Sequence, residues 1–233
     1  MLSLSPDETQ ALLLSLKVAF WSVAVSLPAA VALAWLLARR DFPGKSLLDA
    51  VVHLPLVLPP VVVGYLLLVL FGRRGPIGAF LDEYLGITLA FRWTGAALAC
   101  ALMGLPLLVR AVRQSLDAVD RGLESAASTL GASPPWVFAT VTLPLILPGI
   151  LTGMLLSFAR SLGEFGATIT FVSNIPGETQ TLPLAIYTFT QVPGGDAQAM
   201  RLCVLSILLS LAALMASELL LRRANVRAAG LDA

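Results

Sequence analysis

The sequence predicts an all-α membrane protein that crosses the bilayer about five times. Of its 233 residues, 58% are hydrophobic and 12% are charged, whereas ordinary soluble domains are about 25% charged. A spanning helix needs roughly 20 mostly apolar residues. Three windows of about that length contain no Asp, Glu, Lys or Arg: Val18–Leu37, Val51–Phe71 and Trp93–Val109. These windows exclude both a soluble domain and a single membrane anchor.

Two further apolar windows complete the count of five. They run from about Ile146 to Phe165 and from about Leu202 to Leu221, and they admit Arg160, Glu164 and Glu218. We expect helices here too, because isolated charges inside a span are tolerated where they pair or face the protein interior.

The segments outside the windows have two further features. Segment 181–192 is apolar but only 12 residues long, which favours a re-entrant or surface helix over a span. The first ten residues carry two acids and no base, unlike the positively charged start of a signal peptide. We therefore expect the first helix to remain in the mature protein.

Basic residues set the expected orientation, because Lys and Arg near helix ends are retained on the cytoplasmic side. With the N-terminus outside, the inner segments carry nine basic residues and the outer segments carry four. The inner residues are Arg39, Arg40, Lys45, Arg110, Arg113, Arg121, Arg222, Arg223 and Arg227, and the outer residues are Arg73, Arg74, Arg92 and Arg201. The sequence therefore predicts a periplasmic N-terminus and a cytoplasmic C-terminus.

The second window is unusually rich in helix-perturbing residues. It contains Pro55, Pro59, Pro60 and Gly64, and each proline removes a backbone donor whose partner carbonyl must be satisfied inside the protein. This indicates a segment buried among neighbouring helices or lining a cavity, with Pro59 and Pro60 as pathway candidates. The alternative is a kinked structural helix. His53, at the inner end, is interpreted as a packing or interface residue.

The fourth window contains an acid and a base with helical spacing. Arg160 and Glu164 are four residues apart and would share one helical face. A pore-lining pair and a structural ion pair are equally compatible with this pattern. Our hypothesis is that Arg160 presents positive charge to an anion that passes through the protein.

Motifs for catalysis and cofactor binding are missing. The residues Gly44, Lys45 and Ser46 spell the end of a P-loop, but the required earlier glycine is replaced by Arg39. One histidine cannot supply a Ser–His–Asp set, and the two cysteines, in apolar runs, are interpreted as packing residues. We expect no enzymatic activity, no metal or cofactor, and, at a net charge of +1, no nucleic-acid partner. Energy for uphill transport must come from another subunit.

A motif in segment 124–150 indicates the function. The segment resembles the EAA loop of ATP-binding cassette (ABC) importer permeases, in which Glu-Ala-Ala is followed by Gly and later by Leu-Pro. The matching residues are Ala126, Ala127, Gly131, Leu143 and Pro144, with Val141 in place of isoleucine. The position of the motif glutamate holds Ser125, and Glu124 is adjacent.

The EAA resemblance implies a short helix that docks on a cytoplasmic ATPase. The expected contact residues are Glu124, Ser125, Ala126, Ala127, Gly131, Trp136, Leu143 and Pro144. Residues 129–135 with Trp136 would form the turn, and Gly131 would permit a sharp helix end. Trp136 would be an interface anchor, and Leu143 with Pro144 would open the next span. The alternative is an amphipathic surface helix followed by a chance Leu-Pro.

The resemblance extends over almost the whole chain. The segments HLPLVLPPVVVGY and SLGEFGATITFVSNIPGET are similar to those of bacterial molybdate transport permeases. This family implies a fold like that of the methionine (MetI-like) and maltose permeases, with residues 1–233 as one transmembrane domain. The EAA coupling loop would span about 120–144, and the periplasmic loops about 72–92 and 173–201.

The same resemblance implies partners and a cargo. The permease would be a homodimer in the lipid of the bacterial inner membrane, with two ATPase subunits and a periplasmic molybdate-binding protein. The cargo would be molybdate or tungstate. Two alternatives stay open at this point, namely a permease of the same type for another oxyanion such as sulfate, and a secondary transporter.

Overall fold

The computed structural model describes residues 4–229, which fold into α-helices and one π-helical turn without any strand. The prediction of an all-α protein is confirmed. The elements are α1 (Pro6–Arg39), α2 (Lys45–Val57), α3 (Pro60–Phe71), α4 (Pro76–Leu85), α5 (Trp93–Ala118), α6 (Arg121–Thr129), α7 (Pro134–Val137), the π-helix η1 (Phe138–Thr142), α8 (Leu143–Leu162), α9 (Gly166–Val172), α10 (Leu182–Gln191) and α11 (Asp196–Ala229).

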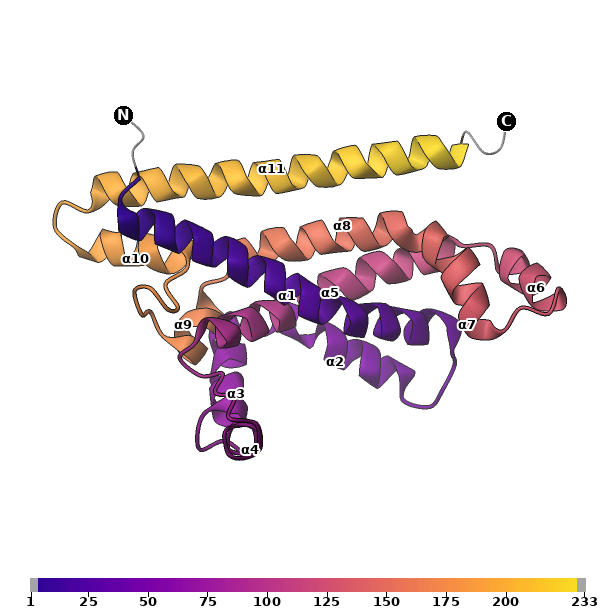
Figure 1. Cartoon of the computed structure of the whole chain (residues 1–233), viewed down its shortest axis with the longest axis horizontal. Coiled ribbons are helices and arrows are strands. Elements are labelled where there is room, and N and C mark those ends of the chain that lie inside the picture. The colour runs from indigo at the N-terminus through magenta and orange to yellow at the C-terminus, as the bar shows by residue number, and fades with distance from the viewer. Residues whose placement is uncertain (1–3, 230–233) are drawn as a thin grey trace.

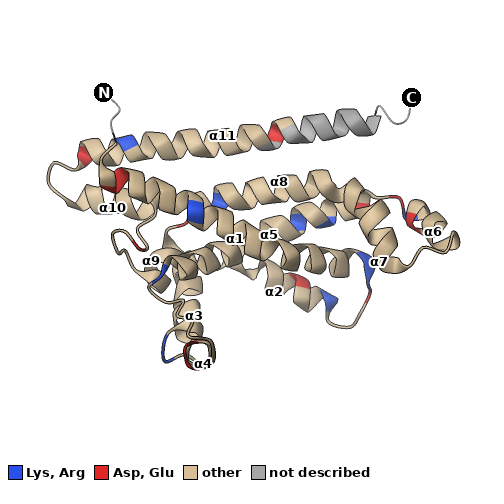
Figure 2. Cartoon of the chain, in the orientation of Figure 1, with Lys and Arg blue, Asp and Glu red and all other residues tan. Residues whose placement is uncertain are grey.

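Within residues 4–229, four helical segments are long and apolar enough to cross a membrane: Pro6–Arg39, Trp93–Ala118, Pro134–Leu162 and Asp196–Ala216. Each overlaps a predicted window and begins at or before the first residue of that window, and the third segment ends at Leu162, three residues before its window does. Charged side chains gather toward the ends of the elements, and the stretches 143–159 and 202–217 have none (Figure 2).

The window Val51–Phe71 is helical but broken, as expected from prolines that perturb a helix. The segment is divided into α2 and α3, which meet at an angle of 113°, so the described residues contain four spans, or up to five if the bent pair is one crossing. The break follows from the prolines, since a residue before proline is driven out of the α region. Leu58 is accordingly extended, with ψ of 143°, and Pro59 has ψ of 132°. Pro60 then opens α3.

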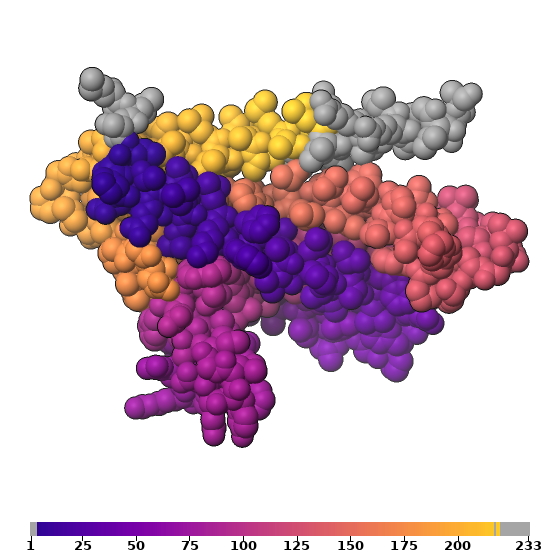
Figure 3. All heavy atoms as spheres, in the orientation of Figure 1, coloured from indigo at the N-terminus to yellow at the C-terminus, as the bar shows by residue number. Residues whose placement is uncertain are grey.

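The long helices lie side by side, and the α3–α4 arm projects from them (Figures 1 and 3). Helix α5 packs against both α1 and α8, and α11 packs against α8 and α10. The segment 181–192 forms the short helix α10 as expected, and α10 buries Leu182, Leu184 and Ala185. The first residues of α1 and α11 lie at one end of the molecule, and α6 lies at the opposite end (Figure 1).

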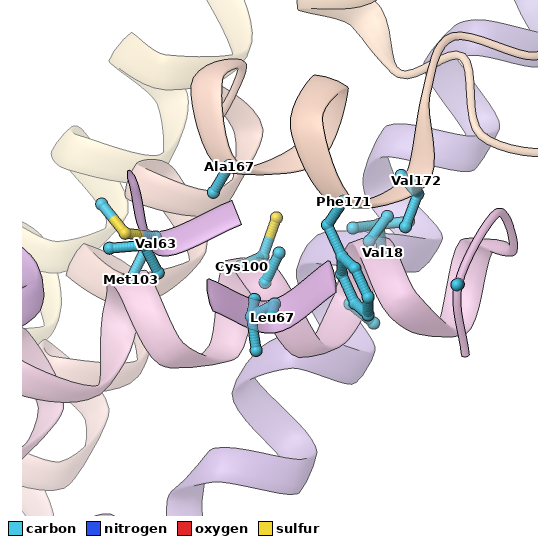
Figure 4. Close-up of a cluster of buried hydrophobic side chains, with 12 residues drawn as sticks. Val18, Val63, Leu67, Cys100, Met103, Ala167, Phe171 and Val172 are labelled. Atoms are coloured by element: carbon cyan, nitrogen blue, oxygen red, sulfur yellow. The ribbon is translucent and has the colours of Figure 1, made fainter. Parts of the chain in front are cut away.

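The core has two main parts along the bundle. One is centred where α3 and α9 cross α5, and it contains Val63, Leu67, Cys100 and Phe171 (Figure 4). The other joins α1, α5 and α8 nearer to α6 and includes Leu37, Leu108 and Ile146. Since Cys100 is buried in the first cluster, its interpretation as a packing residue agrees with the structure.

Small residues allow the helices to approach closely. A Cβ built on Gly104 would lie 2.2 Å from the Ser157 hydroxyl oxygen, and one on Gly64 would lie 2.5 Å from the Ala167 carbonyl oxygen. Such contacts are typical of membrane helices, where packing replaces the hydrophobic effect as the force between helices. Helix α3 therefore rests directly on the backbone of α9.

A buried ion pair fixes the end of the bundle where the chain begins. Ser5 and Glu8 form a capping box at the start of α1. The Glu8 carboxylate is fully buried and pairs with Arg201 of α11, with Nη2 and Oε1 2.9 Å apart. The pair joins two helices whose first residues are almost 200 positions apart, and it locks their register at this end.

We predict that Gly64→Ala destabilises the protein more than Gly163→Ala. The added methyl group would clash with the α9 backbone, and overpacking of this kind costs about 1–3 kcal/mol. Gly163 is a matched control because a Cβ there meets nothing within 4 Å. Thermal unfolding of the detergent-purified variants measures the difference. Equal melting temperatures would show that α3 does not depend on this close approach.

Candidate functional site

The EAA segment folds into a short helix with a defined start and end. The Asp120 side chain accepts a hydrogen bond from the Gly122 backbone N–H at 2.8 Å, which caps the start of α6. The end falls before Gly131, whose φ is +88°. A residue with a side chain is strained in this left-handed conformation. The expectation that Gly131 ends the helix sharply is therefore met, and the position requires glycine.

Helix α6 lies exposed at the surface of the protein. No residue of α6 is buried, and Leu130, directly after it, is 89% exposed. Leu123 and Trp136 are exposed as well. We call these three side chains the EAA-loop surface. Large apolar side chains exposed on neighbouring elements are typical of a surface that binds another protein.

Glu124 and Ser125 point in different directions. Ser125 is exposed and donates to the Arg121 carbonyl oxygen of its own helix. Glu124 is 22% exposed and faces the protein, where its Oε1 lies 3.0 Å from Arg39 Nη2 and accepts a hydrogen bond of 2.7 Å from the Thr142 hydroxyl. The acid beside the motif position is thus engaged within the chain.

The turn after α6 is shorter than predicted. Residues 129–135 were expected to form it, but Thr129 ends α6 and Pro134, Pro135 and Trp136 already belong to α7. Proline fits the first turn of a helix because its missing N–H would be unpaired there. The prediction of Trp136 as a loop residue is therefore wrong, although its side chain is exposed as an interface anchor requires.

Leu143 and Pro144 begin α8 as predicted, but no loop precedes them. The chain is helical from Pro134 onward, and η1 joins α7 to α8 with the Leu143 N–H bonded to the Phe138 carbonyl oxygen. Pro144 has no N–H to donate to the preceding turn, and wide turns of this kind occur where the regular ladder is interrupted.

The second predicted site contains Arg160 and Glu164. Helix α8 stops at Leu162, so the prediction that the two residues share one helical face is wrong. The Glu164 side chain nevertheless reaches back, and its Oε2 lies 2.7 Å from Arg160 Nη1. Its Oε1 accepts a hydrogen bond of 2.8 Å from the Ala167 N–H and so caps α9.

Burial distinguishes the two partners of this pair. Glu164 is buried, whereas the Arg160 side chain is 31% exposed. Glu164 thus has a structural role as anchor and cap. Arg160 keeps part of its guanidinium side chain accessible while its position is fixed.

The break between α8 and α9 contacts the break between α2 and α3. A Cβ on Gly166 would lie 2.8 Å from the Pro60 side chain, and Gly166 is two residues after Glu164. The structure therefore brings the four pathway candidates Pro59, Pro60, Arg160 and Glu164 into one region.

The other polar clusters have structural partners. His53 Nδ1 lies 2.9 Å from the Asp49 carbonyl oxygen, and the Asp49 carboxylate pairs with Arg113 of α5 at 3.1 Å. Asp49 thus joins α2 to α5, whereas the polar contacts of His53 are with Asp49 of its own helix. Within residues 4–229 no group of three or more His, Cys, Asp or Glu side chains could hold a metal ion.

Comparison with known proteins identifies the family. Residues 27–226 match the family described as binding-protein-dependent transport system inner membrane component. This chain belongs to that family. It is therefore an inner-membrane component of a transport system, and the EAA resemblance is confirmed at the level of the family.

Relatives with similar sequences are named either as molybdenum permeases or as sulfate permeases. The molybdenum transport system permease protein ModB of Escherichia coli K12 is 61% identical over 97% of this chain and 98% of its own length. That of Haemophilus influenzae is 59% identical over 93% and 94%. The sulfate transport system permease protein CysW of Synechococcus elongatus is 41% identical over 76% of this chain and 62% of its own.

Solved structures of family type confirm the fold. The inward-facing methionine ABC transporter MetNI gives a TM-score of 0.66 at 17% identity, covering 93% of this chain and 94% of the other. A bacterial ABC transporter that imports the acidic polysaccharide alginate gives 0.69 at 15% identity, covering 95% and 80%. The predicted permease fold of the methionine type is therefore confirmed.

Two contacts could not be read from the family motif. Arg39 and Thr142 are the partners of Glu124, and Arg39 lies 85 positions before it. Sequence reasoning named Arg39 only as an inner basic residue. An available signal was its position at the end of the first window, where a base next to hydrocarbon needs an acidic partner.

We predict a graded loss of stability when Glu164 is changed. Glu164→Gln keeps an oxygen for the Ala167 N–H but removes the ion pair, whereas Glu164→Ala removes both. We expect a loss of about 1–3 kcal/mol for the first variant and about 3–5 kcal/mol for the second. Denaturant unfolding of the purified protein measures both, and a Gln variant as stable as the wild type would mean that the ion pair contributes nothing.

Proposed function

We propose that this chain is the membrane-spanning subunit of an ATP-driven importer that moves molybdate, or the similar oxyanion tungstate, across the inner membrane. The identity of 61% over nearly the whole length to a molybdenum permease carries this proposal. The permease itself catalyses no reaction, and a partner subunit hydrolyses the ATP.

The partner that supplies energy is an ABC ATPase, present in two copies. The EAA-loop surface supports this assignment, since Leu130 and Trp136 are large, apolar and exposed, and α6 and α7 lie at one end of the molecule (Figure 1). Aromatic residues that insert in a partner's pocket often carry much of the binding energy. Ala126, Ala127 and Ser125 lie on the same exposed helix.

The orientation follows from the same partner. With α6 in the cytoplasm, the first residues of α1 and α11 lie outside, because Figure 1 places them at the opposite end. The proposed orientation is therefore a periplasmic N-terminus and a cytoplasmic C-terminus, as the distribution of basic residues predicts. A periplasmic molybdate-binding protein would dock on the loops 72–92 and 173–201, and a second copy of the permease would complete the pathway.

The pathway would pass the two helix breaks. Broken helices at the depth of the membrane are tolerated where they are buried or line a cavity, and transporters use them to gate a site from opposite sides in turn. Arg160 is the basic residue held at this break with part of its side chain exposed, which suits a transient contact with an oxyanion.

A sulfate importer of the same type is the second candidate, because sulfate permeases are 40–41% identical over 76% of this chain. Uptake of labelled molybdate by cells that produce the permease, the ATPase and the binding protein distinguishes the two. We expect uptake that excess tungstate inhibits and equal sulfate does not. Sulfate as the stronger competitor would overturn the molybdate assignment.

The same assay separates an ABC importer from a secondary transporter. We expect uptake to vanish when the ATPase gene carries an inactivating change in its P-loop lysine. Uptake that persists without the ATPase and follows an ion gradient would assign a secondary transporter.

We predict that Ala127→Glu and Gly131→Glu abolish uptake and leave the permease in the membrane. The first places a charge on the half-buried side of α6, and the second strains the residue that requires a positive φ. Immunoblots of membranes and molybdate uptake provide the two readouts. Retained uptake in both variants would contradict the coupling role of this helix.

We predict that Arg160→Lys retains more uptake than Arg160→Gln. Lysine keeps the positive charge and can still pair with Glu164, whereas glutamine removes it. The expected loss for Arg160→Gln is on the order of tenfold, the effect of about 1.4 kcal/mol. Unchanged uptake in Arg160→Gln would exclude Arg160 from the pathway.

A further inference from the structure

We propose that Glu124 is an internal clamp that ties α6 to α1 and to η1, so that the coupling helix moves as one body with α1 and α8. This inference rests on the proposed function for its consequence in transport. The clamp itself is a property of the permease alone. Glu124 is on this view a positioning residue, and it does not contact the ATPase.

One carboxylate oxygen of Glu124 accepts hydrogen bonds from two other segments. Glu124 Oε1 receives the Arg39 guanidinium at 3.0 Å and the Thr142 hydroxyl at 2.7 Å. Hydrogen bonds with a charged partner are about twice as strong as neutral ones. One carboxylate oxygen thereby links three segments: the end of α1, the middle of α6, and the last residue of η1.

Arg39 depends on its ion pair with Glu124. Its side chain is 10% exposed, and its Nε has no hydrogen-bond partner within the part of the chain that the structure describes. An arginine buried to this extent needs a compensating acid. Glu124 supplies it, so an acid turned toward the ATPase would leave Arg39 uncompensated.

The π-helix η1 turns Thr142 toward Glu124. Val137, Thr142 and Ile146 are all buried, and the first step is five residues, whereas an uninterrupted α-helix would bury positions three or four apart. The π-helical turn adds one residue to the turn. That shift places the Thr142 hydroxyl on the buried side, where it meets Glu124.

Within the described residues, few other side-chain contacts hold α6 against the rest of the protein. None of its residues is buried, so apolar packing cannot fix it firmly. Besides the clamp, the Arg121 guanidinium donates to the Ala38 carbonyl oxygen at 3.4 Å, a long hydrogen bond. Helix α6 also contacts α7 and η1, which continue into α8. Among its side chains, Glu124 makes the shorter polar contact with α1 and adds one with Thr142 of η1.

The test uses Glu124→Gln and Thr142→Val, with Ser125→Ala as matched control on the exposed side of the same helix. Hydrogen exchange of the purified permease reports the clamp without ATPase or cargo. We expect the amides of α6 to exchange at least tenfold faster in Glu124→Gln, and several-fold faster in Thr142→Val. The control should match the wild type, and unchanged exchange in both clamp variants would overturn the proposal.

The second readout uses the complete transporter. We expect Glu124→Gln to retain the bound ATPase and its ATP hydrolysis while uptake per ATP falls at least tenfold. Arg39→Glu combined with Glu124→Arg should restore part of the uptake. Loss of the bound ATPase in Glu124→Gln would instead assign Glu124 to the interface, and normal uptake would also overturn the clamp.

The two readouts separate this proposal from the proposed function. If wild-type uptake does not depend on the ATPase but α6 exchanges faster in Glu124→Gln, the function is wrong and the clamp stands. If uptake depends on the ATPase and exchange is unchanged, the function stands and the clamp is wrong.

Discussion

The polar groups of this apolar chain have to find partners inside the protein, and α1 shows how that constraint organises the structure. Its first turn carries Glu8, which pairs with Arg201 of α11, and its last residue, Arg39, pairs with Glu124 of α6. In its middle, the hydroxyl groups of Ser22 and Ser161 are 2.9 Å apart. Helix α1 is thus fixed at three heights to elements that come much later in the sequence. Since unpaired polar groups are costly in a membrane, these ties give the bundle one register.

The same constraint explains the two helix breaks. Where α8 stops, Glu164 accepts a hydrogen bond from the Ala167 N–H in the first turn of α9, and its other oxygen compensates Arg160. Where α2 stops, two prolines without N–H groups reduce the number of unpaired donors. Pro60 then packs on Gly166, so each break supports the other. At this break Glu164 is buried while Arg160 remains partly accessible.

The sequence predicted the apolar spans, the glycine that ends α6 and the start of α8 at Leu143, because these depend on local composition and on backbone preferences of single residues. It did not predict the 113° bend between α2 and α3, since apolar windows carry no information about direction. Nor did it predict that Glu124 faces inward, because its partner Arg39 comes from a distant helix and Thr142 is placed by a π-helical turn. Contacts between distant segments depend on tertiary packing, which no single window encodes.

The central claim is that α6 moves with α1, and a distance between spin labels tests it most directly. The labels would replace Arg40 and Ser125 in one permease copy of the assembled transporter, in a background without Cys100 and Cys203. If α6 moves with α1, ATP binding leaves the Arg40–Ser125 distance distribution unchanged. A shift or broadening of the Arg40–Ser125 distribution on ATP binding would contradict it, because α6 would then move independently of α1.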